Sequence, residues 1–163
     1  VDLKATAPIG AIVEQSPARA AVAKAVGERF AVHGGAALVV DYGFVGPGVG
    51  DTLQAVKAHA FADVLATPGE ADVTSHVDFW ALGKAFAGAG AAVTPITTQG
   101  AFLNALGALE RMAALKRKAS AAQVRELDAA YARLTGPEAM GTLFKVVCAY
   151  SPATLQPVGF AAA

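Results

Sequence analysis

The sequence is short of cysteine, of net charge and of bulky apolar side chains. Its one cysteine, Cys148, cannot form an intramolecular disulfide, so nothing in the 163 residues requires an oxidising compartment. Thirteen basic and 13 acidic residues cancel, which removes the long-range attraction that nonspecific binding to nucleic acid or an acidic membrane needs. Apolar residues make up 55% of the chain, but 40 of them are alanine. The remainder is enough for one hydrophobic core, so we expect a single domain.

Long uninterrupted apolar runs are absent as well. The uncharged stretch 85–109 is long enough to cross a bilayer, but it contains Pro95, several threonines and four glycines. The stretch 146–163 carries two prolines and has no basic flank. The first residues show no apolar signal core. We therefore expect a cytoplasmic protein without a membrane partner.

Strand-like and helix-like segments alternate along the chain. The apolar run 36–40 is typical of a strand buried on both faces of a parallel sheet. Ser16-Pro17 is a typical helix start, because serine accepts an orphan backbone N–H and proline loses nothing in the first turn. Strands are expected at 10–14, 36–40, 91–97 and 142–150; helices at 17–33, from Ser75 to Gly88, at 100–118 and at 124–134; and mixed strand and loop at 52–65. This alternation predicts an α/β architecture with a mainly parallel sheet.

Two of the expected strands end in an acidic residue, Glu14 and Asp41. Ligands of an open α/β sheet bind beyond the carboxyl ends of its strands, so either acid could face a ligand. Either could instead cap the following turn. Capping is the favoured interpretation for Glu14, and both alternatives stay open for Asp41.

The segment 43–50 has four glycines and a proline, as cofactor loops often do. However, the glycines do not follow the Gly-x-Gly-x-x-Gly register, and Pro47 removes one amide donor. No clear amphipathic helix follows. The pattern therefore favours a loop over a cleft, with a nicotinamide-binding Rossmann protein as an open alternative.

Other signals of chemistry are weaker. His33, His59 and His76 have no partners at metal-ligand spacing, so no metal site is expected. From Asp41 to Asp78 six acids face Lys57 alone, a surface that is either a solvated acidic face or a site for a cationic group. The basic excess within 111–133 is explained by a solvated helical face. Cys148 lies in an apolar strand, where a thiol is normally inert.

Several strings together resemble the second half of the MidA-like family of class I S-adenosylmethionine-dependent methyltransferases, which includes a mitochondrial complex I assembly factor that methylates arginine in proteins. The matches keep their order from about Gly10 to Lys145. The strings are Asp41-Tyr-Gly43, Asp51-Thr-Leu-Gln-Ala55, His59, Pro68-Gly-Glu-Ala-Asp-Val-Thr74, His76-Val-Asp-Phe79, Gln99 with Phe102-Leu103, and Met140-Gly-Thr-Leu-Phe-Lys145. One departure is Phe44, where the family often has His or Tyr.

The resemblance implies a fold: the C-terminal half of a class I methyltransferase (Rossmann-like) sheet, mainly parallel with an antiparallel last strand. Residues 36–41 would be the fifth strand and 142–150 the last, with a helical elaboration at about 100–135. Residues 1–163 would be a single partial domain, and the cofactor motif of the family would lie upstream, outside this chain. The open edge of the innermost strand would then pair with the N-terminal half of the protein or with a second copy.

The resemblance also implies a function, methyl transfer from S-adenosylmethionine to an arginine side chain of a protein substrate, carried out by the intact protein and not by this fragment alone. The expected catalytic residues are Asp41 and His59. The expected substrate-binding residues are Tyr42, Gly43, Asp72, His76 and Asp78, with Asp78 also suited to cap a helix. A non-catalytic assembly module that binds a basic partner stays open as an alternative, and neither version calls for nucleic acid.

Overall fold

The structure is a computed structural model that describes residues 7–46, 48–151 and 157–160. Its helices are α2 (Pro17–His33), α3 (Phe79–Gly88), α4 (Gln99–Ala105), α5 (Ala108–Lys116), α6 (Ala121–Thr135) and α7 (Met140–Leu143). Its strands are β1 (Ala36–Phe44), β2 (Gln54–Lys57), β3 (Ala60–Ala62), β4 (Asp72–Thr74), β5 (Val77–Asp78), β6 (Ala92–Val93), β7 (Thr97–Thr98) and β8 (Phe144–Tyr150). Within the described ranges, no helix combines the length and apolarity needed to cross a membrane.

The main sheet has the strand order β5-β1-β8-β6, and β7 also pairs with β8. Strands β1 and β5 are parallel, whereas β8 is antiparallel to β1, β6 and β7. Within this sheet, every strand except β8 therefore runs in one direction. This confirms the predicted sheet, mainly parallel with an antiparallel last strand. The structure adds that this last strand lies next to β1.

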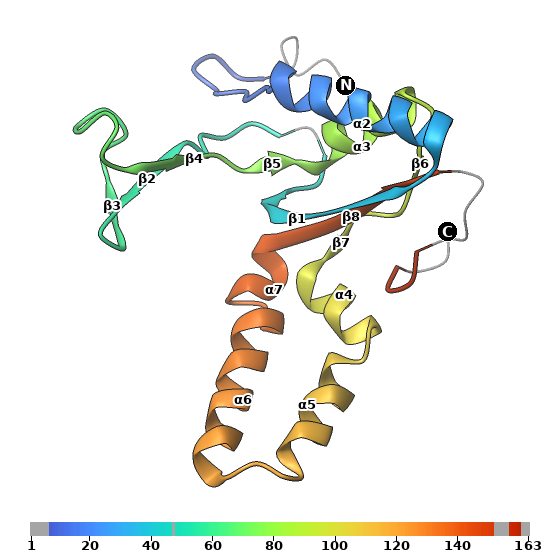
Figure 1. Cartoon of the computed structure of the whole chain (residues 1–163). Helices are drawn as coiled ribbons and strands as arrows, with labels where there is room; N and C mark the ends of the chain where they lie inside the picture. Colours follow the sequence, from blue (N-terminus) through green and yellow to red (C-terminus); the bar gives the residue numbers. More distant parts are fainter. Residues whose placement is uncertain (1–6, 47, 152–156, 161–163) are drawn as a thin grey trace.

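Helices α2 and α3 cover one face of this sheet (Figure 1). Ser16 caps α2 by accepting the Arg19 N–H, and α2 ends at Gly34, which has a φ of +71°. The stripe Phe79, Leu82 and Phe86 is buried against the sheet, as the periodicity predicts. The core therefore lies between these two helices and the strands β1 and β8.

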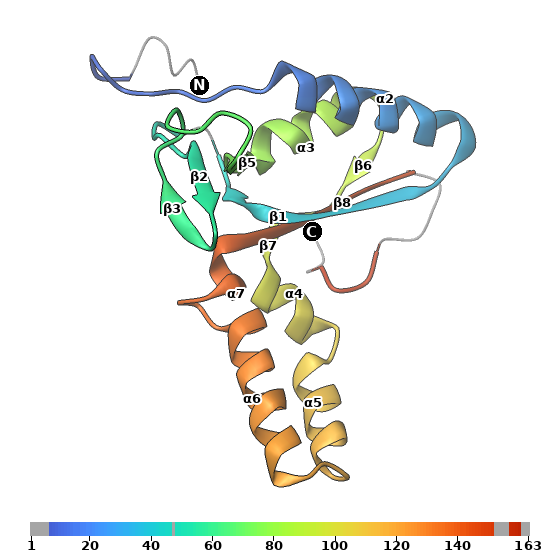
Figure 2. The same ribbon diagram turned by 60° about the vertical axis from the view of Figure 1, so that its left-hand side comes forward.

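Two segments project from the sheet, one toward the left and one downward in Figure 2. The first is an arm, residues 51–75, in which three short strands pair in the order β3-β2-β4. Its β2–β3 turn is formed by Ala58 and His59, both with positive φ. The second is a helical hairpin formed by α5 and α6. A capping box of Ser120 and Gln123 starts its second helix, α6. The arm accounts for the mixed strand and loop expected at 52–65, and the hairpin lies within the expected helical elaboration.

Several sequence-based boundaries are wrong. The strand expected at 36–40 continues through Asp41 to Phe44, and the strand expected at 142–150 begins at Phe144, because Met140–Leu143 form α7. The strand expected at 10–14 is absent, since Ile12 O accepts one hydrogen bond from Gly50 N (2.9 Å) and no ladder follows. The helix expected at 100–118 breaks at Gly107, whose φ of +85° is left-handed. The cap of α3 is Asp78, not Ser75, because Val77 and Asp78 pair with β1. The strand expected at 91–97 is divided around Pro95 into β6 and β7.

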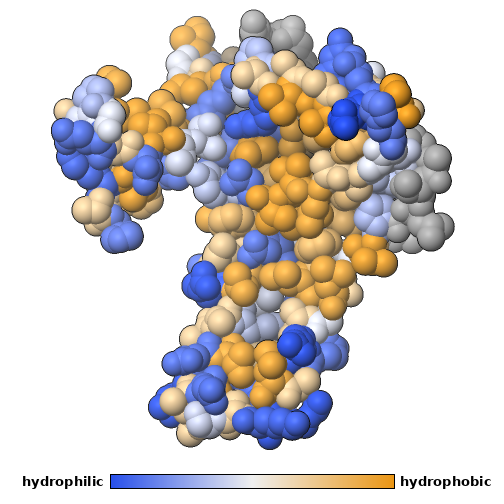
Figure 3. Space-filling view, in the orientation of Figure 1, coloured by the Kyte–Doolittle hydropathy of each residue, from blue (hydrophilic) through white to orange (hydrophobic). Residues whose placement is uncertain are grey.

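Hydrophobic side chains gather in the middle of the molecule, around the sheet, and the tips of the arm and of the helical hairpin are more hydrophilic (Figure 3). Strand β1 shows why part of this surface is apolar. Ala37 and Val39 pack toward α2 and α3, whereas the alternating residues Leu38 and Val40 are 53% and 42% exposed. Along residues 36–42, β8 lies on one side, and on the other side β5 pairs only with Gly43 and Phe44. Within the described chain, the opposite face and one edge of β1 are therefore uncovered.

Candidate functional site

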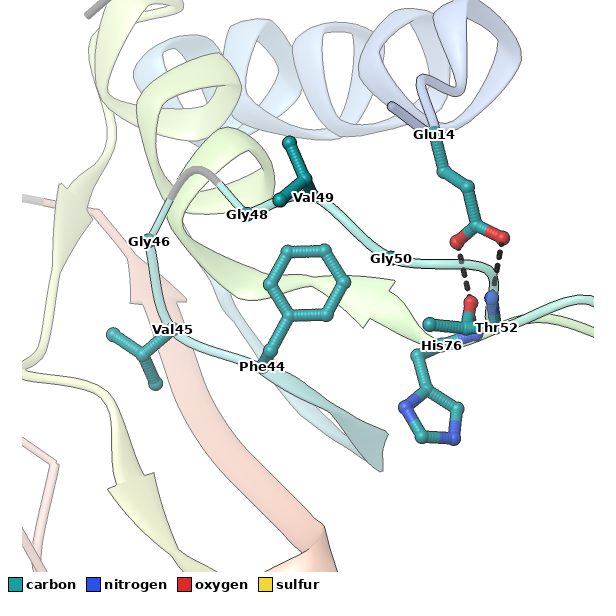
Figure 4. A pocket seen from close by; sticks show the side chains of 9 residues that line it. All are labelled: Glu14, Phe44, Val45, Gly46, Gly48, Val49, Gly50, Thr52 and His76. Carbon is teal, nitrogen blue, oxygen red and sulfur yellow. Dashed lines mark hydrogen bonds between the residues drawn. The ribbon is translucent and has the colours of Figure 1, made fainter. Parts of the chain in front are cut away.

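A cavity of about 330 Å³ lies beyond the carboxyl end of β1, where α/β sheets bind ligands. Figure 4 shows its lining, which comes from the segment before α2, the glycine loop after β1, and the segment before β5. The lining residues are Glu14, Phe44, Val45, Gly46, Gly48, Val49, Gly50, Thr52 and His76. The loop thus lies over a cleft, as the glycine pattern indicates.

A polar network joins three of these segments. The carboxylate of Glu14 accepts a hydrogen bond from the Thr52 backbone N (2.8 Å) and a second from the Thr52 hydroxyl. The Thr52 Oγ1 in turn accepts from the His76 backbone N (2.9 Å). The sequence favours a capping role for Glu14 in the turn that follows it, and this prediction is wrong. Glu14 instead binds Thr52, which is 38 positions further along the chain.

A group of aromatic rings lies next to the cavity, around Tyr42 of β1. The Tyr42 and His76 rings meet edge to face, with centroids 5.5 Å apart, and the Tyr42 and Phe144 rings do so at 5.6 Å. These contacts hold His76 beside the end of β1. Of the predicted substrate-binding residues, Tyr42 and His76 are therefore brought together.

Asp41 lies in β1 one residue before Tyr42, so its side chain is on the opposite face of the strand. Its Oδ1 accepts the Tyr42 backbone N–H (2.8 Å), and its partner across the strand pair is Lys145. Lys145 donates to the carbonyl oxygen of Leu143 (3.4 Å) and to that of Thr142, and burial lowers the pKa of its ammonium group. The sequence places Asp41 at a strand end, but β1 continues to Phe44, so Asp41 lies within the strand, and it is not among the described residues that line the cavity.

The other predicted residues are spread over the fold. His59 is exposed at the β2–β3 turn of the arm, and Asp72 is exposed in β4. Asp78 caps α3 by accepting the Ala81 backbone N–H (2.9 Å), which is the structural role that its position in the sequence favours. The structure thus places His59 and Asp72 on the arm, apart from the end of β1 (Figure 1). Their predicted roles, and that of Asp41, stay predictions.

Gly43 has a packing reason for being glycine. A Cβ at this position would lie 2.2 Å from the Val77 carbonyl oxygen and 2.9 Å from the Phe79 ring. Strands β1 and β5 therefore approach each other here only because no side chain intervenes.

Replacing Gly43 with alanine is expected to lower the free energy of unfolding by about 1–3 kcal/mol or more, because neither the carbonyl nor the buried ring can easily move away. Thermal unfolding of the protein measures the change. The matched control is Gly88→Ala, since a Cβ at Gly88 meets no atom within 4 Å and its φ is not positive. Equal stability of the two variants would contradict this packing role.

Cys148 fits the expectation of an inert thiol. Its side chain is buried in β8, and burial raises the pKa of the thiol, so the nucleophilic thiolate is disfavoured at neutral pH. No group of three or more metal-ligating side chains is found among the described residues.

The sequence analysis does not assign Glu14, Phe44 or Thr52 to a cavity. It favours a capping role for Glu14, and it treats Phe44 only as a position where the family's polar His or Tyr is absent. The signal that could have found them is positional, since each lies next to the end of an expected strand or of the glycine loop. The link between Glu14 and Thr52 has no local pattern, because it spans 38 positions.

The described residues do not by themselves form a site for S-adenosylmethionine. Nucleotides are held where a strand leads through glycines into a helix N-terminus. Here β1 leads through its glycines into β2, and β5 and β7 run directly into α3 and α4 without a loop. The arrangement agrees with a cofactor motif outside this chain, so no step is derived in which these residues hold the cofactor.

Comparison with proteins of known sequence gives consistent results. Residues 2–97 match a family model described as "Putative S-adenosyl-L-methionine-dependent methyltransferase". The chain is 35% identical over 134 residues to a Xenopus laevis protein, "Protein arginine methyltransferase NDUFAF7, mitochondrial", and 38% identical over 133 residues to the Homo sapiens protein of that name. These alignments cover 82% and 81% of this chain and 30% of each relative. The chain thus spans about 30% of the length of these relatives.

Two solved structures from Burkholderia thailandensis share the fold. One, an uncharacterized protein, superposes with a TM-score of 0.78 at 28% identity and covers 89% of this chain and 40% of its own. The other is bound to S-adenosyl-homocysteine and superposes with a TM-score of 0.73 at 26% identity, covering 89% of this chain and 38% of its own. The predicted half of a class I methyltransferase sheet is confirmed by these superpositions.

The comparisons also correct one expectation. A cytoplasmic location is wrong, because the relatives from Xenopus laevis, Homo sapiens and Drosophila melanogaster are all named as mitochondrial. The expectation depended on the lack of a signal, and such a lack in a chain that aligns with about 30% of its relatives is not informative. The family match extends over more than half of the chain, from residue 2 to residue 97, and the chain therefore belongs to this family of S-adenosyl-L-methionine-dependent methyltransferases.

Proposed function

We propose that the intact protein transfers a methyl group from S-adenosylmethionine to an arginine side chain of a protein, and that the described residues build the acceptor side of its site. The observation that carries the proposal is the cavity at the carboxyl end of β1. The chain that forms this cavity shares its fold with a solved structure that is bound to S-adenosyl-homocysteine. Relatives named as protein arginine methyltransferases support arginine as the acceptor. The cofactor would be held by residues outside this chain.

The main task of the acceptor side in this reaction is to position the acceptor nitrogen in line with the sulfur–methyl bond. In an in-line displacement the sulfur–methyl bond breaks as the nitrogen–methyl bond forms, and the acceptor nitrogen releases a proton. A guanidinium keeps its proton in water, so carboxylates near it must orient it and balance its charge. Asp41, half-buried within β1 and outside the cavity, is proposed to balance the positive charge of the acceptor from the opposite face of the strand. Tyr42 and His76, whose rings meet edge to face, are proposed to form a wall of the acceptor site.

The arm is proposed to contact the acceptor protein at a greater distance from the reacting nitrogen. His59 and Asp72 are both exposed there, and the exposed Phe61 lies near them on β3. Asp78 and Gly43 act by holding β5 and α3 in place. On this proposal the residues predicted from the sequence divide into a group at the strand end, a group on the arm, and a structural group.

The test is methyl transfer by the intact protein. Tritium from labelled S-adenosylmethionine should enter a pool of peptides that each carry one arginine, and should not enter the matched pool in which lysine replaces arginine. Asp41→Asn should lower kcat by about 10²-fold, in the range of a lost charge-balancing group, while the dissociation constant of S-adenosyl-homocysteine stays unchanged. Binding of basic peptides without any transfer would instead indicate a non-catalytic assembly module.

A further inference from the structure

The cavity at the end of β1 contains one carboxylate among the described residues that line it, that of Glu14. Both of its oxygens accept a hydrogen bond from Thr52, Oε1 from the backbone N at 2.8 Å and Oε2 from the hydroxyl. A carboxylate has about four lone-pair positions, so each oxygen keeps one for a further donor. The Glu14 carboxylate is thus fixed in orientation, and it can still accept further hydrogen bonds.

The anchor of this carboxylate is itself held. The Thr52 hydroxyl donates to Glu14, and its oxygen accepts from the His76 backbone N at 2.9 Å, so the direction of the hydroxyl is set from both sides. The glycine loop is attached to the same region, since the Gly50 backbone N donates to the Ile12 carbonyl oxygen at 2.9 Å. Three chain segments therefore hold Glu14 in one geometry, and a group held in this way loses little freedom when a ligand binds.

The rest of the lining suits a flat cation. Phe44 presents an aromatic ring to the cavity, as Figure 4 shows, and Val45 and Val49 add apolar surface. A guanidinium combines a planar face that stacks on aromatic rings with edge N–H groups that pair with a carboxylate. The volume of about 330 Å³ is at the lower end of the range of small-ligand sites and accommodates one arginine side chain.

We propose that Glu14 is the carboxylate that binds the guanidinium of the acceptor arginine, with Thr52 as its positioning residue and Phe44 as the stacking surface. The inference rests on the proposed arginine methylation and specifies the residue that selects the acceptor. Asp41 does not line the cavity, so its proposed role is separate from that of Glu14. Phe44 is consistent with this role, because stacking needs an aromatic face and no polar group.

The experiment compares two peptides on the intact protein saturated with S-adenosyl-homocysteine. One is the best arginine peptide from the methylation pool, and the other carries citrulline, the neutral isostere, at the same position. Glu14→Gln removes the charge and keeps an acceptor for the Thr52 N–H. It should weaken binding of the arginine peptide by about 10- to 100-fold, the effect of losing a charge-assisted hydrogen bond, and leave the citrulline peptide unchanged. Thr52→Val should give a smaller loss with the arginine peptide, because the charge is still present.

Glu28→Gln is the matched control, since the Glu28 carboxylate is on α2, away from the cavity lining and the arm, where it forms an exposed ion pair with Lys24 at 3.7 Å. It should change neither affinity. Equal losses for the arginine and citrulline peptides in Glu14→Gln would overturn the inference, because they would mean that Glu14 only holds the loop. If the unmodified protein methylates arginine and Glu14→Gln does so with unchanged KM, the inference alone fails. If the unmodified protein methylates no arginine peptide, the proposed function fails.

Discussion

Replacing Phe79 with alanine is expected to lower the free energy of unfolding by about 3–5 kcal/mol. Phe79 is the largest side chain in the structure with no exposed surface, and it is the first residue of α3. It packs below the junction of β1 and β5, where Gly43 leaves space for its ring. Truncation would therefore leave a cavity that the backbone of the sheet cannot fill.

Urea denaturation, followed by the fluorescence of the neighbouring Trp80, measures the effect of this substitution. Phe61→Ala is the matched control, because it removes the same atoms from a side chain that is 81% exposed on the arm. It should change the free energy of unfolding by less than about 0.5 kcal/mol. A loss of similar size in both variants would mean that the core is not centred on Phe79.

The parts of the fold that the sequence predicts well depend on local chemistry. Ser16, Pro17 and Gly34 mark the ends of α2, and the spacing of Phe79, Leu82 and Phe86 marks the buried face of α3. The strand at 36–40 follows from a continuous apolar run. Each of these features needs only neighbouring residues to be recognised.

The parts that the sequence does not predict depend on contacts between distant segments. The arm strands have three or four residues each and exist because they pair with one another, so no single segment carries a clear period. The break at Gly107 could be anticipated as a cost, but glycine in a helix does not by itself fix a left-handed turn. Residues 10–14 have strand-like composition and lack a partner strand within the described chain.

The candidate site shows the same division. Asp41 and Tyr42 are adjacent in a matching string, yet alternation along β1 sends their side chains to opposite faces. His59 belongs to the same resemblance and lies at the tip of the arm. Glu14 has no special spacing in the sequence, and only the folded chain shows that it binds Thr52 in a cavity.

Replacing Val40 with aspartate is expected to lower the free energy of unfolding of the intact protein by more than about 3 kcal/mol. The expectation rests on the proposal that residues outside this chain cover β1. Val40 is 42% exposed here, on the sheet face opposite to α2 and α3, and the neighbouring edge of β1 is unpaired within the described chain. A preceding half-sheet, or a second copy, would bury this side chain, and an unpaired charge in its place would then be costly.

Val73→Asp is the control for this last comparison, because Val73 has a similar exposure of 52% but lies on the arm. In the intact protein it should cost less than about 0.5 kcal/mol. Denaturation of both variants under one set of conditions, with sedimentation to separate an intramolecular cover from a dimer, completes the test. If both substitutions are tolerated equally, the open face of β1 is a solvent-facing surface in the intact protein, and a sheet completed by a further half is excluded. A large difference instead means that the apolar residues of β1 stabilise the contact with the covering segment. This contact would explain why Leu38 and Val40 are exposed apolar side chains in the described chain.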